Sequence, residues 1–131
     1  MSTNKSGISY HEPQQIEALP ETEFNDLPFG AIQLDSDGVI MKYNSYEARL
    51  AGRDPREVIG QNFFTEVAPC TNVQEFAGRF REGIGKGVLN TTFPYRFLFP
   101  DNYIDVEITM ILGRDGKSSW VFVKETQRAN S

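Results

Sequence analysis

Two short apolar stretches joined by a tight polar segment open the patterned part of the chain. They are FGAIQLD at positions 29–35 and VIMKY at positions 39–43, and Asp35-Ser36-Asp37-Gly38 lies between them. Gly and Asp residues supply the backbone angles that tight turns need. Apolar runs on both sides of such a turn are typical of antiparallel pairing. The pattern therefore predicts a β-hairpin over residues 29–43.

Between residues 44 and 87 the pattern favours short helices. Asn44, with Glu47 three residues later, fits a helix-capping pattern, and Gly52 is placed to end that helix. The run Asp54-Pro55-Arg56-Glu57 combines a capping residue, a proline at the first helical position and a capping-box glutamate. A second helix is therefore predicted to begin there and to end near Gly60.

A third short segment, QNFFTEVAP, ends at Pro69, and a longer helix is predicted after it. We expect Asn72 with Glu75 to cap this helix, and Gly85 and Gly87 to close it. Three apolar residues recur at every fourth position along one of its faces: Phe76, Phe80 and Ile84.

The last part of the chain returns to strand patterns, in VLNTTFPYRFLF (88–99), YIDVEITMIL (103–112) and SSWVFVKE (118–125). Pro94 has no backbone N–H to donate, so its strand is expected at an edge or a bulge. The order of elements predicts an α+β architecture, with a central antiparallel β-sheet of about five strands and short helices crossing one face.

The first two dozen residues are polar and show only weak periodicity, around Ile16, Leu19 and Phe24. They predict a leader with one short helix, packed loosely or conditionally on the rest of the chain. We accordingly divide the chain into a flexible N-terminal leader or cap at 1–25, a globular domain at 26–126 and a polar C-terminal tail at 127–131.

Composition places the chain among single globular domains of cytoplasmic proteins. Of its 131 residues, 39% are hydrophobic and 24% are charged, which is enough apolar side chain for one core. No window approaches the roughly 20 apolar residues of a membrane span, and no apolar secretory signal is present. The net charge of −5, with scattered basic residues, disfavours binding to nucleic acid or to an anionic membrane surface.

A single cysteine and a single histidine restrict the chemistry that is available. One cysteine excludes an intramolecular disulfide and a multi-thiolate metal site. His11 lies in the leader, which disfavours a Cys–His hydrolase and a haem held by a histidine deep in the fold. The chemistry therefore falls to carboxylates, tyrosines or Cys70.

Several residues have a structural and a functional interpretation. Cys70 follows a proline and precedes a predicted helix start, so a thiolate there is expected to feel the positive end of that helix. Alternatively, it is a small buried hydrophobic residue. Taken alone, Glu47 is an exposed, ionised capping residue, Tyr43 is a strand end with its hydroxyl in water, and Arg53 is a solvated charge.

Six sequence blocks, in this order and at this spacing, resemble the PAS-fold family of photoactive yellow protein. The resemblance runs from about residue 26 to residue 124, and the blocks are FGAIQLD, YN-x-x-E, GRDP, VIG-x-NFF, VAPCT and WVFVK. It implies a blue-light photoreceptor, not an enzyme, that carries p-coumaric acid (4-hydroxycinnamic acid) as a thioester on Cys70.

The resemblance also implies roles for particular side chains. The matched Glu47 is buried beside the phenolic oxygen of the chromophore, where desolvation and a neighbouring anion raise a carboxyl pKa. The matched Tyr43 is the second hydrogen-bond donor to that oxygen, and the matched Arg53 covers the pocket. Its apolar walls are expected from five further side chains: Ile32, Phe63, Val67, Phe97 and Val121.

The chain departs from the family pattern at two places. Ala51 stands where the pattern has a threonine that hydrogen-bonds the tyrosine hydroxyl. Pro100-Asp101-Asn102 stands in the loop facing the ring, where the pattern has a methionine that helps the chromophore to return to trans. These changes concern colour and recovery rate, and Ala51 and Asp101 are therefore included among the expected pocket residues.

The mechanism implied by the resemblance starts with trans–cis isomerisation in blue light. A proton then passes from Glu47, and the resulting buried charge opens weakly held parts of the fold, which a downstream signalling protein reads. We expect a monomer or weak dimer. The alternatives are a chromophore-free PAS interaction module and an enzyme with Cys70 as nucleophile. A flavin-binding light sensor is disfavoured because no GxNCRFLQ-like helix occurs.

Overall fold

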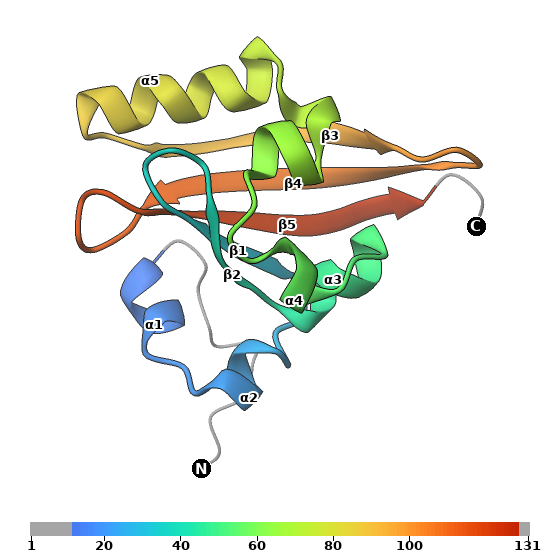
Figure 1. Ribbon diagram of the computed structural model, residues 1–131, viewed down its shortest axis with the longest axis horizontal. Helices are drawn as coiled ribbons and strands as arrows, with labels where there is room; N and C mark the ends of the chain where they lie inside the picture. The colour runs from blue at the N-terminus through green and yellow to red at the C-terminus, as the bar shows by residue number, and fades with distance from the viewer. Residues whose placement is uncertain (1–11, 129–131) are drawn as a thin grey trace.

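The structure, a computed structural model, describes residues 12–128 (Figure 1). The leader residue His11 and positions 129–131 of the predicted tail lie outside the described residues. Within that range the chain forms one antiparallel sheet in the order β2-β1-β5-β4-β3. Its strands are β1 (Gly30–Leu34), β2 (Ile40–Tyr43), β3 (Asn90–Leu98), β4 (Tyr103–Leu112) and β5 (Ser119–Arg128). The predicted five-stranded antiparallel architecture is confirmed.

The hairpin β1–β2 forms at the predicted place because its turn is satisfied locally. The Asp35 carboxylate accepts hydrogen bonds from the N–H groups of Asp37 and Val39, both at 2.9 Å. Gly38 adopts a positive φ of 91°, which favours glycine. The resulting register sets Ile32 opposite Tyr43. β3 lies at the other edge of the sheet, as Pro94 predicts.

Short helices and helical turns cover the inner face of the sheet. They are α3 (Ser45–Ala51), α4 (Pro55–Val58), the π-helical turn η2 (Phe63–Val67), the 3-10 turn η3 (Pro69–Thr71), the π-helical turn η4 (Gln74–Gly78) and α5 (Arg79–Lys86). Four alternating residues of β4 are buried beneath them: Ile104, Val106, Ile108 and Met110. The predicted ends of the first two helices are also found, with Gly52 in the left-handed region after α3.

The predicted start of the longest helix is wrong. Residue Val73 precedes the wide turn η4, and α5 begins only at Arg79. Asn72 does not cap it, because its side-chain oxygen accepts a hydrogen bond from Arg81 at 2.8 Å. Gly85 lies inside α5, and Gly87 alone ends the helix, with a φ of 71°.

The N-terminal helices α1 (Pro13–Glu17) and α2 (Glu21–Phe24) cover the outer face. Ile16 is only 2% exposed, and the indole N–H of Trp120 donates to the Glu17 carboxylate at 3.0 Å. Two helices form where one was predicted, and the buried Ile16 shows that α1 is not loosely packed in this structure. At the other end, β5 runs to Arg128, so the first two residues of the predicted tail belong to the sheet.

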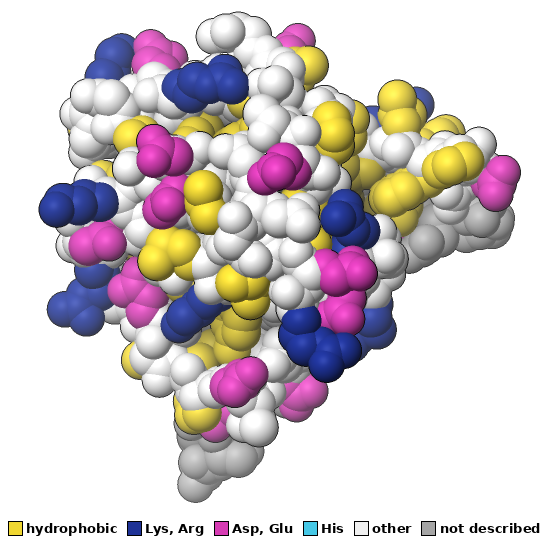
Figure 2. All heavy atoms as spheres, viewed as in Figure 1, with side chains coloured by type: hydrophobic (Ala, Val, Ile, Leu, Met, Phe, Trp, Pro, Cys, Tyr) yellow, Lys and Arg dark blue, Asp and Glu magenta, His cyan; other side chains and the backbone are white. Residues whose placement is uncertain are grey.

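Charged side chains of both signs are interspersed over the face drawn in Figure 2. No large area of a single sign stands out on that face, in line with the scattered charges in the sequence. Among residues 12–128, the structure holds no helix of the length and apolar character that a membrane crossing requires.

Candidate functional site

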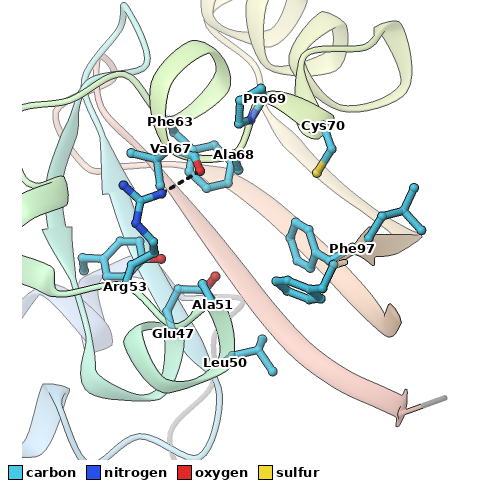
Figure 3. A pocket seen from close by; sticks show the side chains of 13 residues that line it. Glu47, Leu50, Ala51, Arg53, Phe63, Val67, Ala68, Pro69, Cys70 and Phe97 are labelled. Carbon is cyan, nitrogen blue, oxygen red and sulfur yellow. Dashed lines mark hydrogen bonds between the residues drawn. The ribbon is translucent and has the colours of Figure 1, made fainter. Parts of the chain in front are cut away.

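A cavity of about 440 Å³ opens between α3, the turns η2 and η3, and the end of β3 (Figure 3). Its walls are mainly apolar, with a few polar groups at separate positions. The lining residues are Tyr43, Glu47, Leu50, Ala51, Arg53, Phe63, Val67, Ala68, Pro69, Cys70, Phe97, Leu98 and Phe99. Cavities of this size and character are typical of small-molecule sites.

Helix α3 carries Glu47 into this cavity because Asn44 fixes its first turn. The Asn44 side-chain oxygen accepts the Glu47 N–H at 3.1 Å and the Ala31 N–H of β1 at 3.0 Å. The Asn44 amide also donates to the carbonyls of Phe24 and Phe29, at 3.3 and 3.0 Å. One fully buried side chain thus joins α3 to the sheet and to the N-terminal segment.

The Glu47 side chain is buried, at 2% exposure, and its Oε1 has no hydrogen-bond partner among the described residues. Gly30 leaves the space for this carboxyl, since a Cβ added there would collide with Oε1. Burial raises the pKa of Glu47 to about 8. The interpretation of Glu47 as an exposed, ionised cap is therefore wrong, and the carboxyl holds its proton at neutral pH.

Tyr43 lies at the end of β2 and is also buried, at 4% exposure. Burial is the main reason that the pKa of its hydroxyl lies well above the usual value. The neighbouring Glu47 raises that pKa further, while Arg53 lowers it. Two acidic groups, both protonated at neutral pH, thus line the same cavity.

Arg53 spans one side of the cavity. Its Nη1 donates to the main-chain carbonyl of Val67 at 3.0 Å, which ties the end of α3 to the turn η2. Figure 3 shows this contact as the dashed line above Glu47 and Ala51. The interpretation of Arg53 as a freely solvated charge is wrong, because its side chain is half-buried and hydrogen-bonded.

Cys70 lies in the short turn η3, and its sulfur points toward Phe97 (Figure 3). The residue is exposed, so the interpretation as a buried hydrophobic residue is wrong. Partial burial of the thiol raises its pKa, although hydrogen bonding from the Leu98 main chain acts in the opposite direction. The expected activation by a helix start is not found, because α5 begins only at Arg79.

The apolar wall was predicted in part. Phe63, Val67 and Phe97 line the cavity, as does Ala51. Ile32 in β1 and Val121 in β5 do not line it, and their side chains are fully buried in the core instead. Asp101 does not line it either, because it is exposed at the turn between β3 and β4.

Sequence reasoning missed several lining residues that are neighbours of predicted ones. Leu50 lies one helical turn after Glu47, which places both side chains on the same face of α3. The others flank Cys70 or follow Phe97 along the chain: Ala68, Pro69, Leu98 and Phe99. Helical spacing and adjacency were the signals that could have identified them.

The arrangement suits a mainly apolar molecule with one electrophilic group and one hydrogen-bond acceptor. Cys70 offers a nucleophile, whereas Tyr43 and Glu47 offer protonated donors elsewhere in the same cavity. The Glu47 carboxyl is also incompletely hydrogen-bonded among the described residues, because its buried Oε1 has no partner there. Among residues 12–128, no group of three or more side chains is placed to hold a metal ion.

The family model described as PAS fold matches residues 18–125. Solved PAS domains of low identity share the architecture, among them one from an HTR-like protein of Haloarcula marismortui, with 19% identity and a TM-score of 0.62. It covers 81% of this chain and 93% of that domain, and it shows the fold alone.

Closer similarity is found to photoactive yellow proteins. The photoactive yellow protein of Rhodothalassium salexigens is 48% identical over 106 residues, which cover 81% of this chain and 85% of that protein. That of Cereibacter sphaeroides is 41% identical, covering 94% and 93%. The photoactive yellow protein domain of the sensor histidine kinase Ppr from Rhodospirillum centenum has 46% identity and a TM-score of 0.83, covering 86% and 98%.

Proposed function

The chain belongs to the photoactive yellow protein family of blue-light photoreceptors, and we propose that it senses blue light through p-coumaric acid joined to Cys70 as a thioester. The family consists of photoreceptors, not enzymes. The observation that carries the proposal is the buried Glu47 carboxyl, which lines one cavity with the Cys70 thiol. That pair of features fits a group with an acyl end and a phenolic end.

When bound, the p-coumaroyl group supplies absorption of blue light, trans–cis isomerisation and a phenolic oxygen that accepts a proton. Tyr43 and Glu47 are the proposed hydrogen-bond donors to that oxygen, and both keep their protons at neutral pH because they are buried. Two donors spread the charge of an anion and hold it without a metal. Arg53 closes the side of the cavity through the Val67 carbonyl and keeps water from the site.

Glu47 is the proposed proton donor after light absorption. Once its proton leaves, a carboxylate remains in a buried site that offers its Oε1 no hydrogen bond from the described residues. An uncompensated buried charge costs several kcal/mol, which is comparable to the stability of a whole small domain. Relief comes from opening the parts held by α3 and by Asn44, which include the segment around Phe24 and Phe29.

The test is reconstitution of the full chain with activated p-coumaric acid, followed by visible spectra in the dark and in blue light. A yellow product that bleaches and recovers is expected, and the Cys70→Ser chain is expected to stay colourless while folded. A colourless wild-type chain would instead favour a PAS interaction module without chromophore. Pigment that remains on Cys70→Ser would contradict the attachment site.

Infrared difference spectra test the role of Glu47 separately. Illumination of the reconstituted wild-type chain is expected to remove a protonated-carboxyl band. The Glu47→Gln chain keeps a hydrogen-bond donor but lacks the transferable proton, so its colour is expected to survive without that band. If the wild-type chain loses no such band, the proton comes from another group.

We propose that the signal is read by a downstream signalling protein, and that the photoreceptor itself acts as a monomer or weak dimer. The proposed opening exposes part of the N-terminal segment, which supplies a surface that is hidden in the dark. Size-exclusion chromatography in the dark and in light tests this, because a released segment increases the apparent size. An unchanged elution volume would argue against a large opening.

A further inference from the structure

The phenol of Tyr95 connects the edge strand β3 to the segment that carries Cys70. Its hydroxyl donates a hydrogen bond to the main-chain carbonyl of Cys70. The Tyr95 ring is fixed by edge-on contacts with Phe76 and Phe97, whose ring centres lie 5.2 and 5.7 Å away. Because Phe97 lines the cavity, the packing that holds Tyr95 belongs to the cavity wall.

The turn around Cys70 sends its own N–H groups to other carbonyls. Thr71 donates to Ala68 at 2.9 Å, Asn72 donates to Pro69 at 3.0 Å, and Val73 donates to Thr71 at 2.8 Å. The Cys70 carbonyl receives the Tyr95 hydroxyl, so a side chain from a distant strand fixes this peptide group. The direction of the Cys70 side chain depends on the orientation of the same backbone.

We propose that Tyr95 is a positioning residue, which holds the Cys70 backbone so that the thiol faces the cavity during acylation. This inference rests on the proposed function. In the step concerned, the Cys70 sulfur forms a bond to the carbonyl carbon of an activated p-coumaroyl donor, such as an acyl anhydride. The bond from that carbon to the leaving group breaks, the leaving group takes the electron pair, and the thiol proton passes to water.

Tyr95 is suited to this role because it stays a donor throughout. Burial raises the pKa of its hydroxyl, and a neighbouring Cys70 thiolate raises it further. The hydroxyl therefore keeps its proton when the thiol loses one. Removal of the hydroxyl alone leaves the ring contacts in place, so the variant Tyr95→Phe isolates the hydrogen bond from the packing.

The experiment compares two alkylating reagents on the full chain without chromophore. Iodoacetamide is small and reaches the exposed thiol from solvent, whereas 2-bromo-4′-hydroxyacetophenone has a phenol ring that fits the cavity. For each chain we take the rate constant of Cys70 alkylation by the aromatic reagent and divide it by the rate constant for iodoacetamide. This ratio is expected to fall about fivefold in Tyr95→Phe, because one hydrogen bond is lost. Thermal melting checks that the variant is folded.

Tyr103→Phe is the matched control. The Arg96 guanidinium lies over the Tyr103 ring, 3.7 Å from the ring centre, and Tyr103 does not line the cavity. The ratio of the two alkylation rate constants in Tyr103→Phe is expected to equal that of the wild-type chain. Should Tyr95→Phe fail to fold, Tyr95→His is used, because its shorter side chain does not reach the Cys70 carbonyl and the same fall is expected. An unchanged ratio in the folded variant overturns the assignment.

Acylation by p-coumaric anhydride separates this inference from the proposed function. The rate of colour formation is expected to fall in Tyr95→Phe by the same factor as the alkylation ratio. If the wild-type chain gains no colour but the alkylation ratio still falls, the proposed function fails and the role of Tyr95 stands. If colour forms equally fast in both chains and the ratio is unchanged, the role of Tyr95 fails alone.

Discussion

Single buried polar side chains define the site more than the apolar wall does. Glu47 is the clearest case, because its burial has a consequence for stability as well as for the proposed light sensing. Its pKa is about 8 in the folded chain and about 4.3 in an unfolded one. The folded state therefore holds a proton that the unfolded state releases, and stability is greatest where both states are protonated.

For the chromophore-free chain, the contribution of the Glu47 proton to the free energy of unfolding is fully present below about pH 4. It is lost as the pH rises through the pKa of Glu47 in the folded chain, near 8. The Glu47→Gln chain is expected to lack this fall, which amounts to several kcal/mol. Urea unfolding between about pH 5 and 8.5 measures it. Glu57→Gln, an exposed change in α4, is the control. Equal slopes for wild type and Glu47→Gln would show that the carboxyl is not buried.

Ser119 offers a second test at this scale, because its buried hydroxyl has no partner among the described residues. Ser119→Ala is expected to leave the free energy of unfolding unchanged or to raise it by about 1 kcal/mol, because no hydrogen bond is lost. Ser118→Ala removes a 3.0 Å hydrogen bond to Asp115 and is expected to cost about 1 kcal/mol. Equal losses in urea unfolding would show that Ser119 has a partner.

At the scale of elements, local patterns predicted what local contacts determine. The hairpin β1–β2 was predicted because Asp35 and Gly38 satisfy the turn from within it. The starts of α3 and α4 were predicted for the same reason, since Asn44 and Asp54 cap their own helices. The predictions of secondary structure fail where a contact with a residue that is not a close neighbour in sequence determines the structure.

Helix α1 and the start of α5 show this second case. Nothing near Ile16 in sequence indicates that Trp120, about a hundred residues later, holds its helix on the sheet. Asn72 has the features of a cap, but Arg81 takes its side-chain oxygen. The site residues show the same difference. Glu47 and Cys70 were identified from local sequence motifs, and both line the cavity. Asp101 was wrongly predicted to line it, because its loop turns outward.

Asn44 provides the test at the element scale, because it joins α3 to β1 and to the N-terminal segment. Asn44→Ala removes hydrogen bonds to two N–H groups and two carbonyls and is expected to cost about 3 kcal/mol. Asp54→Ala removes only the local cap of α4 and hydrogen bonds to Arg56, and is expected to cost about 1 kcal/mol. The rate of backbone amide hydrogen exchange in Asn44→Ala is expected to rise both in α3 and near Phe24. A rise confined to α3 would limit Asn44 to a local cap.

At the scale of the whole molecule, the sheet separates the cavity from the N-terminal cover. The cavity lies on the inner face with α3, and the helices α1 and α2 lie on the outer face with Trp120. Asn44 at the edge of the sheet contacts both sides. Under the proposed mechanism, charge created at Glu47 on one face is expected to loosen the cover on the other through Asn44, without disrupting the tightly packed strands.

Glu17 is the residue that tests how this cover is held. Its carboxylate accepts the indole N–H of Trp120, which is fully buried, stacked on Phe122 and edge-on to Phe24. Glu17→Ala leaves that N–H without its acceptor, which costs about 1–3 kcal/mol and is expected to open α1 rather than the whole domain. Trp120 is the only tryptophan, so its emission reports the change directly.

In the dark, the Glu17→Ala chain is expected to show a red-shifted tryptophan emission and faster hydrogen exchange at positions 13–17. Exchange in β4 is expected to stay slow. Glu21→Ala, an exposed change in α2, is expected to alter neither signal. An unchanged emission in Glu17→Ala would show that apolar contacts such as those of Ile16 hold α1 on their own. Exchange that rises equally in β4 would show that the outer cover and the sheet unfold as one unit, leaving no separate segment for light to release.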